Sequence, residues 1–289
     1  MSLSAPGKVW FVGAGPGAAD LLTVRAIRVL AQADIVLHDA LMTEALLEWA
    51  PAAKHVPVGK RCEGTAMPQA NIDRALIDAA RTHAVVVRLK GGDPGIFGRL
   101  DEEIDALDAA GIPWDIVPGV TSASAAAAAV GHSLTRRGVA RAVQIVTPRI
   151  GRGEQGGGQW AQGLDPAATV VLYMAGRMAQ ACALTLLAHR FAAHTPVVVV
   201  HAVSWPQQSI ERTDLTRLAR DGLAVDERPV VLMVGEALRE RAFGPPMDAP
   251  IDSATDSDID WPVDTPHVIV QPHVQLQVMP APQVPTLIS

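Results

Sequence analysis

Short apolar runs alternate with longer stretches of helical spacing along the first 240 residues of the chain. Runs of four to six residues rich in Val, Ile and Leu predict strands that are buried on both faces. In the first half we expect strands at residues 9–12, 34–38, 54–58, 85–90 and 114–117. Helices are expected at residues 20–30, 43–50, 68–82, 99–110 and 121–130. Asp20 is expected to cap the first of these helices and Pro68 to begin the third.

The second half repeats the alternation after a basic, helix-poor connector at residues 134–141. Strands are expected near residues 142–147, 169–174, 197–201 and 229–234, and helices at 177–189 and 214–221. The glycine-rich stretch 151–163 is expected to be a mobile loop. Alternating strands and helices predict an α/β fold with ligand loops at the carboxyl ends of the strands. We therefore expect two α/β domains, residues 1–138 and 139–244.

The last 45 residues have a different composition. Residues 245–289 contain nine of the 22 prolines, six aspartates, and no glycine, lysine or arginine. This composition predicts a disordered tail. Subtracting its six acids from the 30 Asp and Glu leaves 24, which balances the 24 Lys and Arg, so the tail carries the whole net charge of −6.

Composition excludes several classes of function. An acidic balance and 4% aromatic residues argue against nucleic-acid binding, which uses basic surfaces and stacking rings. Cys62 and Cys182 form no C-x-x-C pair, so we expect a reducing, cytoplasmic location. No apolar run is long enough to cross a membrane. His189 and His194 are five residues apart and off one helical face, and we expect no metal site.

A first glycine loop follows the strand at residues 9–12. Its pattern Gly13-x-Gly15-x-x-Ala18, with Asp39 after the second strand, fits the dinucleotide fingerprint of an oxidoreductase. Pro16 argues against that interpretation, because proline removes a backbone N–H that would otherwise bind a diphosphate. A measured affinity for NAD(P) would be needed to support it.

A second loop, residues 88–99, carries two glycines followed by an acid and a proline. Gly91 and Gly92 lack a Cβ and let a ligand approach the backbone closely. Asp93 can accept hydrogen bonds from an amine or a ribose, and its charge suits a cationic ligand. Pro94 stiffens the turn.

Together, these loops resemble those of the tetrapyrrole methylase family. The resemblance rests on residues 12–17, 20–23, 33–39 and 88–99, and covers roughly residues 8–240 in order. Within the family, the segments 58–61, 67–69, 117–122 and 134–138 are most similar to uroporphyrinogen-III C-methyltransferases, and 173–176 and 234–236 are similar in the second half. The resemblance implies two α/β domains with the active site in a cleft between them, and a homodimer.

It also implies a reaction. Such enzymes transfer two methyl groups from S-adenosylmethionine to carbons 2 and 7 of uroporphyrinogen III, giving precorrin-2 and S-adenosylhomocysteine, without a metal. Carried over by position, the acid/base candidates are Asp39 and Lys60, and Arg99 is a third catalytic candidate. The acceptor contacts are Arg99, Glu102 and Arg137. The donor-binding set is Pro16, Gly91, Gly92, Asp93, Ile96, Thr121, Ser122, Met174 and Val203.

Residue types fit that chemistry, because arginine forks suit an acceptor with eight carboxylates. Arg99, Arg136, Arg137 and Arg141 are expected near the domain junction. An arginine rarely deprotonates, so Arg99 is better suited to clamp a carboxylate than to act as a base.

The chain departs from the family pattern mainly at the substrate rim, at Ala40, Thr65, Pro148 and the loop 151–163. Two alternatives therefore stay open: a methylase of a later precorrin, and a relative that binds donor or tetrapyrrole without turnover.

Overall fold

The computed structural model of the 289-residue chain describes residues 5–40, 42–59, 67–149, 158–224 and 228–240. By its internal contacts the chain divides into the units Met1–Gly244 and Pro245–Ser289. All described residues belong to the first unit. The expected tail, Lys60, and residues 151–157 of the expected glycine-rich loop lie outside the described residues.

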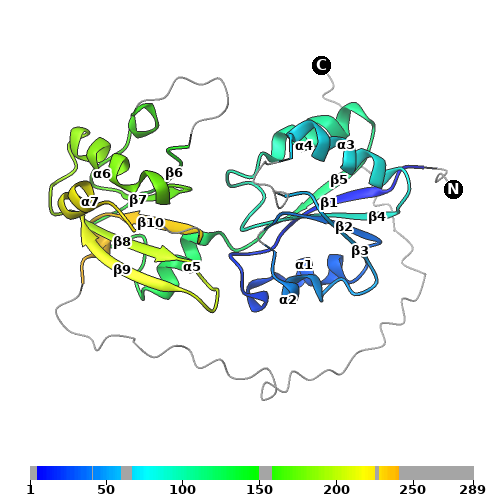
Figure 1. Cartoon of the computed structure of the whole chain (residues 1–289), viewed down its shortest axis with the longest axis horizontal. Helices are drawn as coiled ribbons and strands as arrows, with labels where there is room; N and C mark the ends of the chain where they lie inside the picture. The colour runs from blue at the N-terminus through cyan, green and yellow to red at the C-terminus, as the bar shows by residue number, and fades with distance from the viewer. Residues whose placement is uncertain (1–4, 41, 60–66, 150–157, 225–227, 241–289) are drawn as a thin grey trace, which may run out of the picture. The chain divides into compact units, whose positions relative to one another are not determined.

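A five-stranded parallel sheet organises the first half of the chain (Figure 1). Its order is β3-β2-β4-β1-β5, and every neighbouring pair is parallel. The strands are β1 (Lys8–Gly13), β2 (Ile35–His38), β3 (Lys54–Pro57), β4 (Val85–Lys90) and β5 (Trp114–Val117). Most residues of β1 and β4 are buried, because both faces of this parallel sheet are covered by helices.

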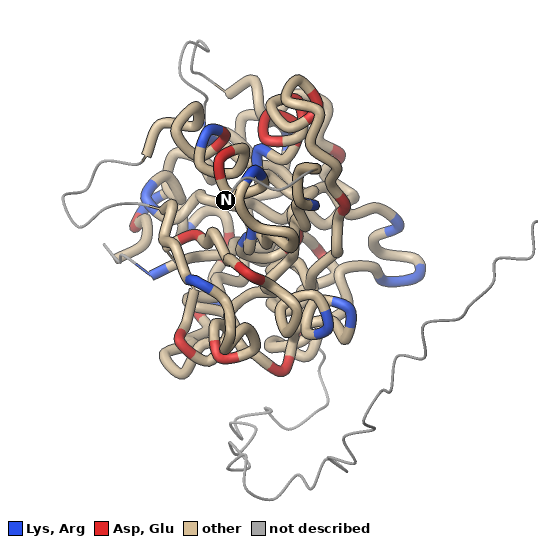
Figure 2. The backbone as a smooth tube through the Cα atoms, turned by 90° about the vertical axis from the view of Figure 1, so that its right-hand side faces the viewer, with Lys and Arg blue, Asp and Glu red and all other residues tan. Residues whose placement is uncertain are grey.

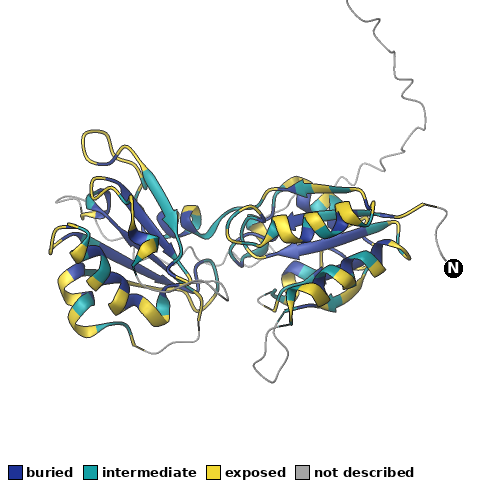
Figure 3. Ribbon diagram, turned by 90° about the horizontal axis from the view of Figure 1, so that it is seen from above, coloured by how far each residue is buried: buried dark blue, intermediate teal, exposed yellow. Residues whose placement is uncertain are grey.

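Helices cover both faces of this sheet (Figure 1). Leu30 of α1 (Val24–Leu30) and Leu46 of α2 (Glu44–Leu47) are buried on one face. Leu76 of α3 (Gln69–Ala80) and Leu107 of α4 (Leu100–Ala109) are buried on the other. Figure 3 shows the buried strands between helices whose outer sides are exposed.

A mixed sheet organises the second half, in the order β6-β7-β10-β8-β9. β6 and β7 are parallel, and the other neighbouring pairs are antiparallel. The strands are β6 (Val143–Val146), β7 (Thr169–Tyr173), β8 (Pro196–His201), β9 (Ser209–Asp214) and β10 (Val230–Val234). Residues of α6 (Ala179–Ala188) and α7 (Leu215–Asp221) pack on one face. Short 3-10 turns complete the elements of the described residues: η1 (Ala19–Leu21), η2 (Gln159–Ala161), η3 (Gly176–Met178) and η4 (Glu236–Leu238).

The alanine-rich helix α5 (Ser122–Ala129) packs on the other face of this second sheet. Its Ala123 and Ala126 are buried in one cluster with Val171 and Val198. Methyl side chains let a helix lie close to a sheet of valines. The expected boundary at residue 138 assigns α5 to the first domain; from this packing, we propose that the boundary lies between β5 and α5.

The local structure differs from the expectations in three places. The prediction that Asp20 caps a helix was wrong: Asp20 lies in η1, and Thr23 caps α1 by accepting a hydrogen bond from Ala26 N at 3.1 Å. Pro68 is the residue before α3 and not its first residue. β9 was not predicted, because it is an edge strand of mostly exposed, polar residues with no apolar pattern.

In the part of the chain that the structure describes, no helix is long and apolar enough to span a bilayer. No group of three or more His, Cys, Asp or Glu side chains within those residues is placed to hold a metal ion. Acidic and basic residues are interspersed along the described backbone (Figure 2).

Candidate active site

The topology of the first sheet brings its two glycine loops together. β1 and β4 are parallel neighbours, and their last residues, Gly13 and Lys90, are partners in the register. The loops that follow therefore leave the sheet side by side. Gly15 N–H donates to Gly92 O at 3.2 Å, and Gly92 N–H donates to Gly15 O at 2.7 Å. The carboxyl edge of a parallel sheet, where such loops meet, is the usual position of a ligand site.

Close backbone packing explains two of the glycines at this edge. A Cβ on Gly13 would lie 2.6 Å from Gly119 Cα, and a Cβ on Gly119 would lie 2.2 Å from Gly92 O. Any larger residue would push the segments apart. Gly13 and Gly119 are therefore required by the fold itself.

Gly91 and Gly92 have open space around them. A Cβ on Gly91 would meet only Met42 Cε, at 3.7 Å, and a Cβ on Gly92 would meet nothing within 4 Å. Gly92 has a φ of +68°, which favours glycine, whereas Gly91 is not among the positive-φ residues. The fold thus gives no reason for glycine at position 91, and the space beside it is available to a ligand.

The Asp93 side chain links the second glycine loop to the segment that follows β5. Its Oδ1 accepts from Gly95 N at 2.8 Å, and its Oδ2 accepts from Gly119 N at 2.9 Å. Each carboxylate oxygen has a further lone pair, so the side chain keeps capacity for a ligand donor. Asp93 therefore has a structural role that the sequence did not reveal.

A cavity of about 290 Å³ opens at this edge. Asp39 and eight of the nine predicted donor-binding residues line it: Pro16, Gly91, Gly92, Asp93, Ile96, Thr121, Ser122 and Met174. It is completed by residues outside the predicted site set: Gly15, Gly17, Met42, Leu46, Lys90, Phe97, Gly98, Tyr173, Trp205, Pro229, Val230 and Val231.

Elements of the second half reach the cavity through specific contacts. Tyr173 Oη lies 2.5 Å from Thr121 Oγ1 and accepts from Ala123 N at 2.6 Å. Burial raises the pKa of the Tyr173 phenol above its ordinary value. Trp205 Nε1 donates to Pro16 O at 3.0 Å. These contacts join β7 and the loop after β8 to the first glycine loop and to α5.

Left-handed backbone conformations gather at the cavity. Phe97 has a φ of +52° and Met174 a φ of +57°, although neither is glycine. Both side chains are about half exposed, at 42% and 45%, and the Phe97 ring meets Tyr173 edge-on at 5.8 Å between centroids. Strain of this kind persists where the surrounding structure enforces it and is common at ligand sites.

The acid Asp39 has a cationic partner from the neighbouring strand. Arg88 Nη2 donates to Asp39 Oδ1 at 2.7 Å. Arg88 Nε in turn donates to Glu103 Oε1 at 3.3 Å, and Lys90 Nζ lies 2.9 Å from the same oxygen. Arg88, Lys90 and Glu103 are all buried, with 1–3% of their surface exposed. One signal for this network was available: residues 88 and 90 are two apart on one strand and share a face.

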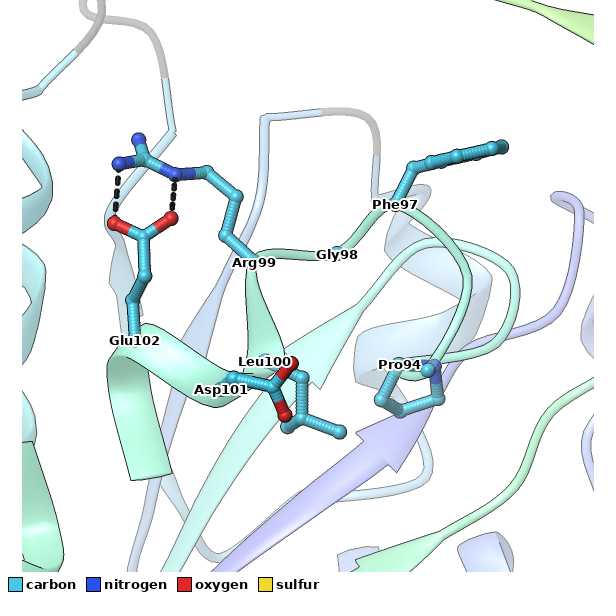
Figure 4. Close-up of a pocket in the computed structure, with 8 residues that line it drawn as sticks. Pro94, Phe97, Gly98, Arg99, Leu100, Asp101 and Glu102 are labelled. Carbon is cyan, nitrogen blue, oxygen red and sulfur yellow. Dashed lines mark hydrogen bonds and ion pairs between the residues drawn. The ribbon is translucent and has the colours of Figure 1, made fainter. Parts of the chain in front are cut away.

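Arg99 and Glu102 lie at an adjoining cavity of about 240 Å³ on the turn that leads into α4 (Figure 4). Arg99 Nε donates to Glu102 Oε1 at 2.7 Å, and Arg99 Nη2 donates to Glu102 Oε2 at 2.6 Å. This pairing raises the pKa of Arg99 and lowers that of Glu102. Arg99 has a φ of +54°, and Phe97 points away from the pair in Figure 4. In this structure the two-pronged Arg99 guanidinium therefore has an internal carboxylate partner, and its expected contact with an acceptor carboxylate stays a prediction.

Two further predicted residues line neither cavity, and a third cannot be placed. Val203 is buried in the core cluster between α5 and the second sheet. Arg137 is exposed on a tight turn whose ends, Arg136 and Ala140, exchange hydrogen bonds at 2.9 and 2.8 Å. Lys60 lies outside the described residues. Trp205, which lines the cavity, stands two residues after Val203 and carried no sequence signal.

The chain is similar to proteins of one family. The sequence model of the family described as tetrapyrrole (corrin/porphyrin) methylases matches residues 8–219. A siroheme synthase from Azotobacter vinelandii is 43% identical over 239 residues, covering 82% of this chain and 51% of the relative. A uroporphyrinogen-III C-methyltransferase from Paracoccus denitrificans is 39% identical over 234 residues, covering 79% of this chain and 80% of the relative. The chain spans about half the length of the siroheme synthases that it matches.

A solved structure has the same fold. Uroporphyrin-III C-methyl transferase from Thermus thermophilus, in complex with S-adenyl homocysteine, superimposes with a TM-score of 0.69 at 36% identity. The match covers 80% of this chain and 99% of that one. The two α/β sheets predicted from the sequence are therefore confirmed.

Proposed function

The chain belongs to the tetrapyrrole methylase family, and we propose that it is an S-adenosylmethionine-dependent C-methyltransferase that converts uroporphyrinogen III to precorrin-2. Two methylations, at carbons 2 and 7, complete that reaction. The observation that carries the proposal is the cavity at the carboxyl edge of the first sheet, which gathers eight of the nine donor-binding residues expected from the family resemblance. A relative that matches over 99% of its length holds S-adenyl homocysteine, the donor without its methyl group.

The space beside Gly91 fits such a donor. A side chain at this position would occupy the cavity without touching the protein closely. Because Gly91 has no Cβ, a ligand such as the donor can approach the backbone closely from the cavity. Asp39 and Asp93 also line the cavity, and carboxylates suit a ligand that carries a sulfonium cation.

Alignment is the main task left to the protein. The donor supplies an activated methyl group, and a pyrrole carbon of the acceptor is an enamine-like nucleophile. Holding two reactants in near-attack geometry supplies several kcal/mol of rate acceleration, about 7 kcal/mol or more in the best cases. Met174 and Phe97 line the cavity from left-handed backbone positions and are suited to contact the reacting groups.

A proton must then leave the acceptor, and this requires a base. Asp39 lines the cavity, is 37% exposed at its side chain, and is oriented by Arg88. It is the acid/base residue that we propose on this geometry, and Lys60 stays a second candidate from the family resemblance.

The acceptor's carboxylates call for arginines at the rim. Arg99 lies beside the main cavity and already binds one carboxylate, that of Glu102. We propose that a substrate carboxylate takes the place of Glu102 on Arg99, and that Arg137 is a further contact. A homodimer located in the cytoplasm is part of the same proposal, and sedimentation of the purified chain tests its oligomeric state.

The function is tested by offering the purified chain labelled S-adenosylmethionine with a panel of acceptors. Freshly reduced uroporphyrinogen III is expected to receive label, and later precorrins are not. Label on a later precorrin alone would replace the proposed acceptor. Calorimetric binding of the donor without label on any tetrapyrrole would support binding without turnover.

A further inference from the structure

The buried lysine at the end of β4 has no part in the function proposed above. Lys90 is 3% exposed, yet it lines the cavity next to Gly91 and Gly92. A lysine is almost never buried to this degree unless it is paired. Its partner is Glu103, 1% exposed, whose Oε1 lies 2.9 Å from Lys90 Nζ.

The two carboxylate oxygens of Glu103 differ in their hydrogen-bond partners. Oε1 accepts from Gln69 Nε2 at 3.3 Å, from Arg88 Nε at 3.3 Å and from Lys90 Nζ at 2.9 Å. Oε2 is buried and has no hydrogen-bond partner among the described residues. An unsatisfied buried carboxylate oxygen costs free energy. A carboxylate held in this way beside an amine can stabilise that amine each time it gains a proton.

Charge balance bears on the protonation state of Lys90. Arg88 and Lys90 face the carboxylates of Glu103 and Asp39, and Glu102 contributes from the start of α4. Burial, with repulsion from Arg88, lowers the pKa of Lys90 below its ordinary value, and Glu103 opposes this only in part. The neutral amine is therefore accessible at a lower pH than for an exposed lysine.

We propose that Lys90 is a proton acceptor of this active site, in addition to Asp39, and that Glu103 positions it. The inference rests on the proposed methyl transfer. After a methyl group joins a ring carbon, the macrocycle is a cation. A neighbouring C–H bond then breaks, its electron pair neutralises the ring, and its proton forms an N–H bond on the neutral Lys90 amine. The ammonium is stabilised by Glu103 and releases the proton to water between turnovers.

A purely structural role for Lys90 predicts different behaviour on substitution. Lys90→Arg keeps a cation beside Glu103, but an arginine does not accept a proton in this range. If Lys90 only balances charge, Lys90→Arg will turn over at close to the wild-type rate. If Lys90 takes the proton, single-turnover methylation will slow by about 100-fold or more, the usual size of a lost acid/base group.

The decisive experiment is chemical rescue. Lys90→Ala is assayed with labelled donor and uroporphyrinogen III, alone and with added methylamine or ethylamine. We expect the rate to fall about 100-fold or more and to recover in proportion to the concentration of the unprotonated amine, which is raised by adding amine or by raising the assay pH. Lys54→Ala, at an exposed lysine on β3, is the matched control and should keep the wild-type rate without an amine effect. Lys90→Arg should be slow and not rescued.

A readout independent of turnover uses the side-chain nitrogen of lysine. In ¹⁵N-lysine-labelled protein, the amine resonance that disappears in Lys90→Arg should titrate below the ordinary lysine range, and Glu103→Gln should lower its midpoint further. Donor affinity by calorimetry should be retained in Lys90→Arg. Should Lys90→Ala fail to fold, Lys90→Arg and this titration decide the question.

The outcomes separate the two proposals. A wild-type chain that methylates no tetrapyrrole overturns both. A wild-type chain that is active, with Lys90→Arg equally fast or Lys90→Ala insensitive to amines, overturns the role of Lys90 alone.

Discussion

Arg88 Nη2 donates a hydrogen bond to Asp39 Oδ1 at 2.7 Å, across the parallel pair formed by β2 and β4. The register places Leu37 beside Arg88, so the residue that follows β2 lies at the same edge as the end of β4. Arg88 is in turn held by the buried Glu103 and by Leu89 O, 3.2 Å from its Nη1. The position of the Asp39 carboxylate is thus set by Arg88, which is itself held by buried partners.

The first prediction concerns this carboxylate. Asp39→Asn keeps the side-chain shape and an oxygen that can accept from Arg88, but removes the negative charge that takes up a proton. Donor affinity by calorimetry should stay within a factor of a few, while turnover should fall by about 100-fold or more. A wild-type rate in Asp39→Asn would remove Asp39 from the mechanism.

The second prediction separates a ligand role from a fold role at adjacent glycines. Gly91→Val fills the open space beside the backbone, so donor affinity should fall about tenfold or more, with unfolding free energy changed by less than about 0.5 kcal/mol. Gly92→Ala must adopt a φ of +68° and should cost about 1–2 kcal/mol of stability. Calorimetry and denaturant unfolding measure the two effects. Unchanged donor affinity in a folded Gly91→Val would contradict the assignment of this loop.

The third prediction tests the double role of Asp93. Asp93→Ala removes the acceptor of Gly95 N and of Gly119 N, so both stability and donor affinity should decrease. The expected loss of unfolding free energy is about 1–3 kcal/mol. Asp93→Asn keeps an oxygen for one of the two N–H groups and should lose less of each. Full donor affinity in Asp93→Ala would leave the residue with only its structural role.

The fourth prediction concerns pH and the core of the second sheet. Burial raises the pKa of the Cys182 thiol from 9.0 to about 12. The folded chain therefore keeps a proton that the unfolded chain loses above pH 9, and this stabilisation disappears as the pH rises from 9 towards 12. Between about pH 9 and about pH 10, the loss should be about 1 kcal/mol. Unfolding of wild type and of Cys182→Ala at both pH values isolates this contribution; equal pH slopes would show that Cys182 titrates normally.

Much of the fold follows from apolar patterning alone. The five strands of the first sheet and four of the second are close to their predicted residues. Most of them contain a short apolar run, and this run is largely buried in β1, β2, β4, β7, β8 and β10. β9 was not predicted, because this exposed edge strand has no run of apolar residues. Asp20 was chosen as a cap from its side chain alone, whereas the turn η1 delays the helix until Thr23.

The cavity could be predicted only in part. Loop residues such as Gly91 and Asp93 carry local signals, and the family resemblance groups them into one donor-binding set. Lys90 and Glu103 are 13 positions apart, on a strand and on a helix, so only the packing of α4 on the sheet brings them together. Trp205 and Pro16 are 189 positions apart, and local patterns in one sequence do not predict a contact over such a separation.

The central claim is tested most directly by one measurement. Purified chain is incubated anaerobically with methyl-labelled S-adenosylmethionine and freshly reduced uroporphyrinogen III, and the extracted tetrapyrrole is analysed by mass spectrometry. We predict two labelled methyl groups per macrocycle, with S-adenosylhomocysteine formed in the same ratio. Unmethylated uroporphyrinogen III, recovered from a folded chain that binds the donor, would contradict the account.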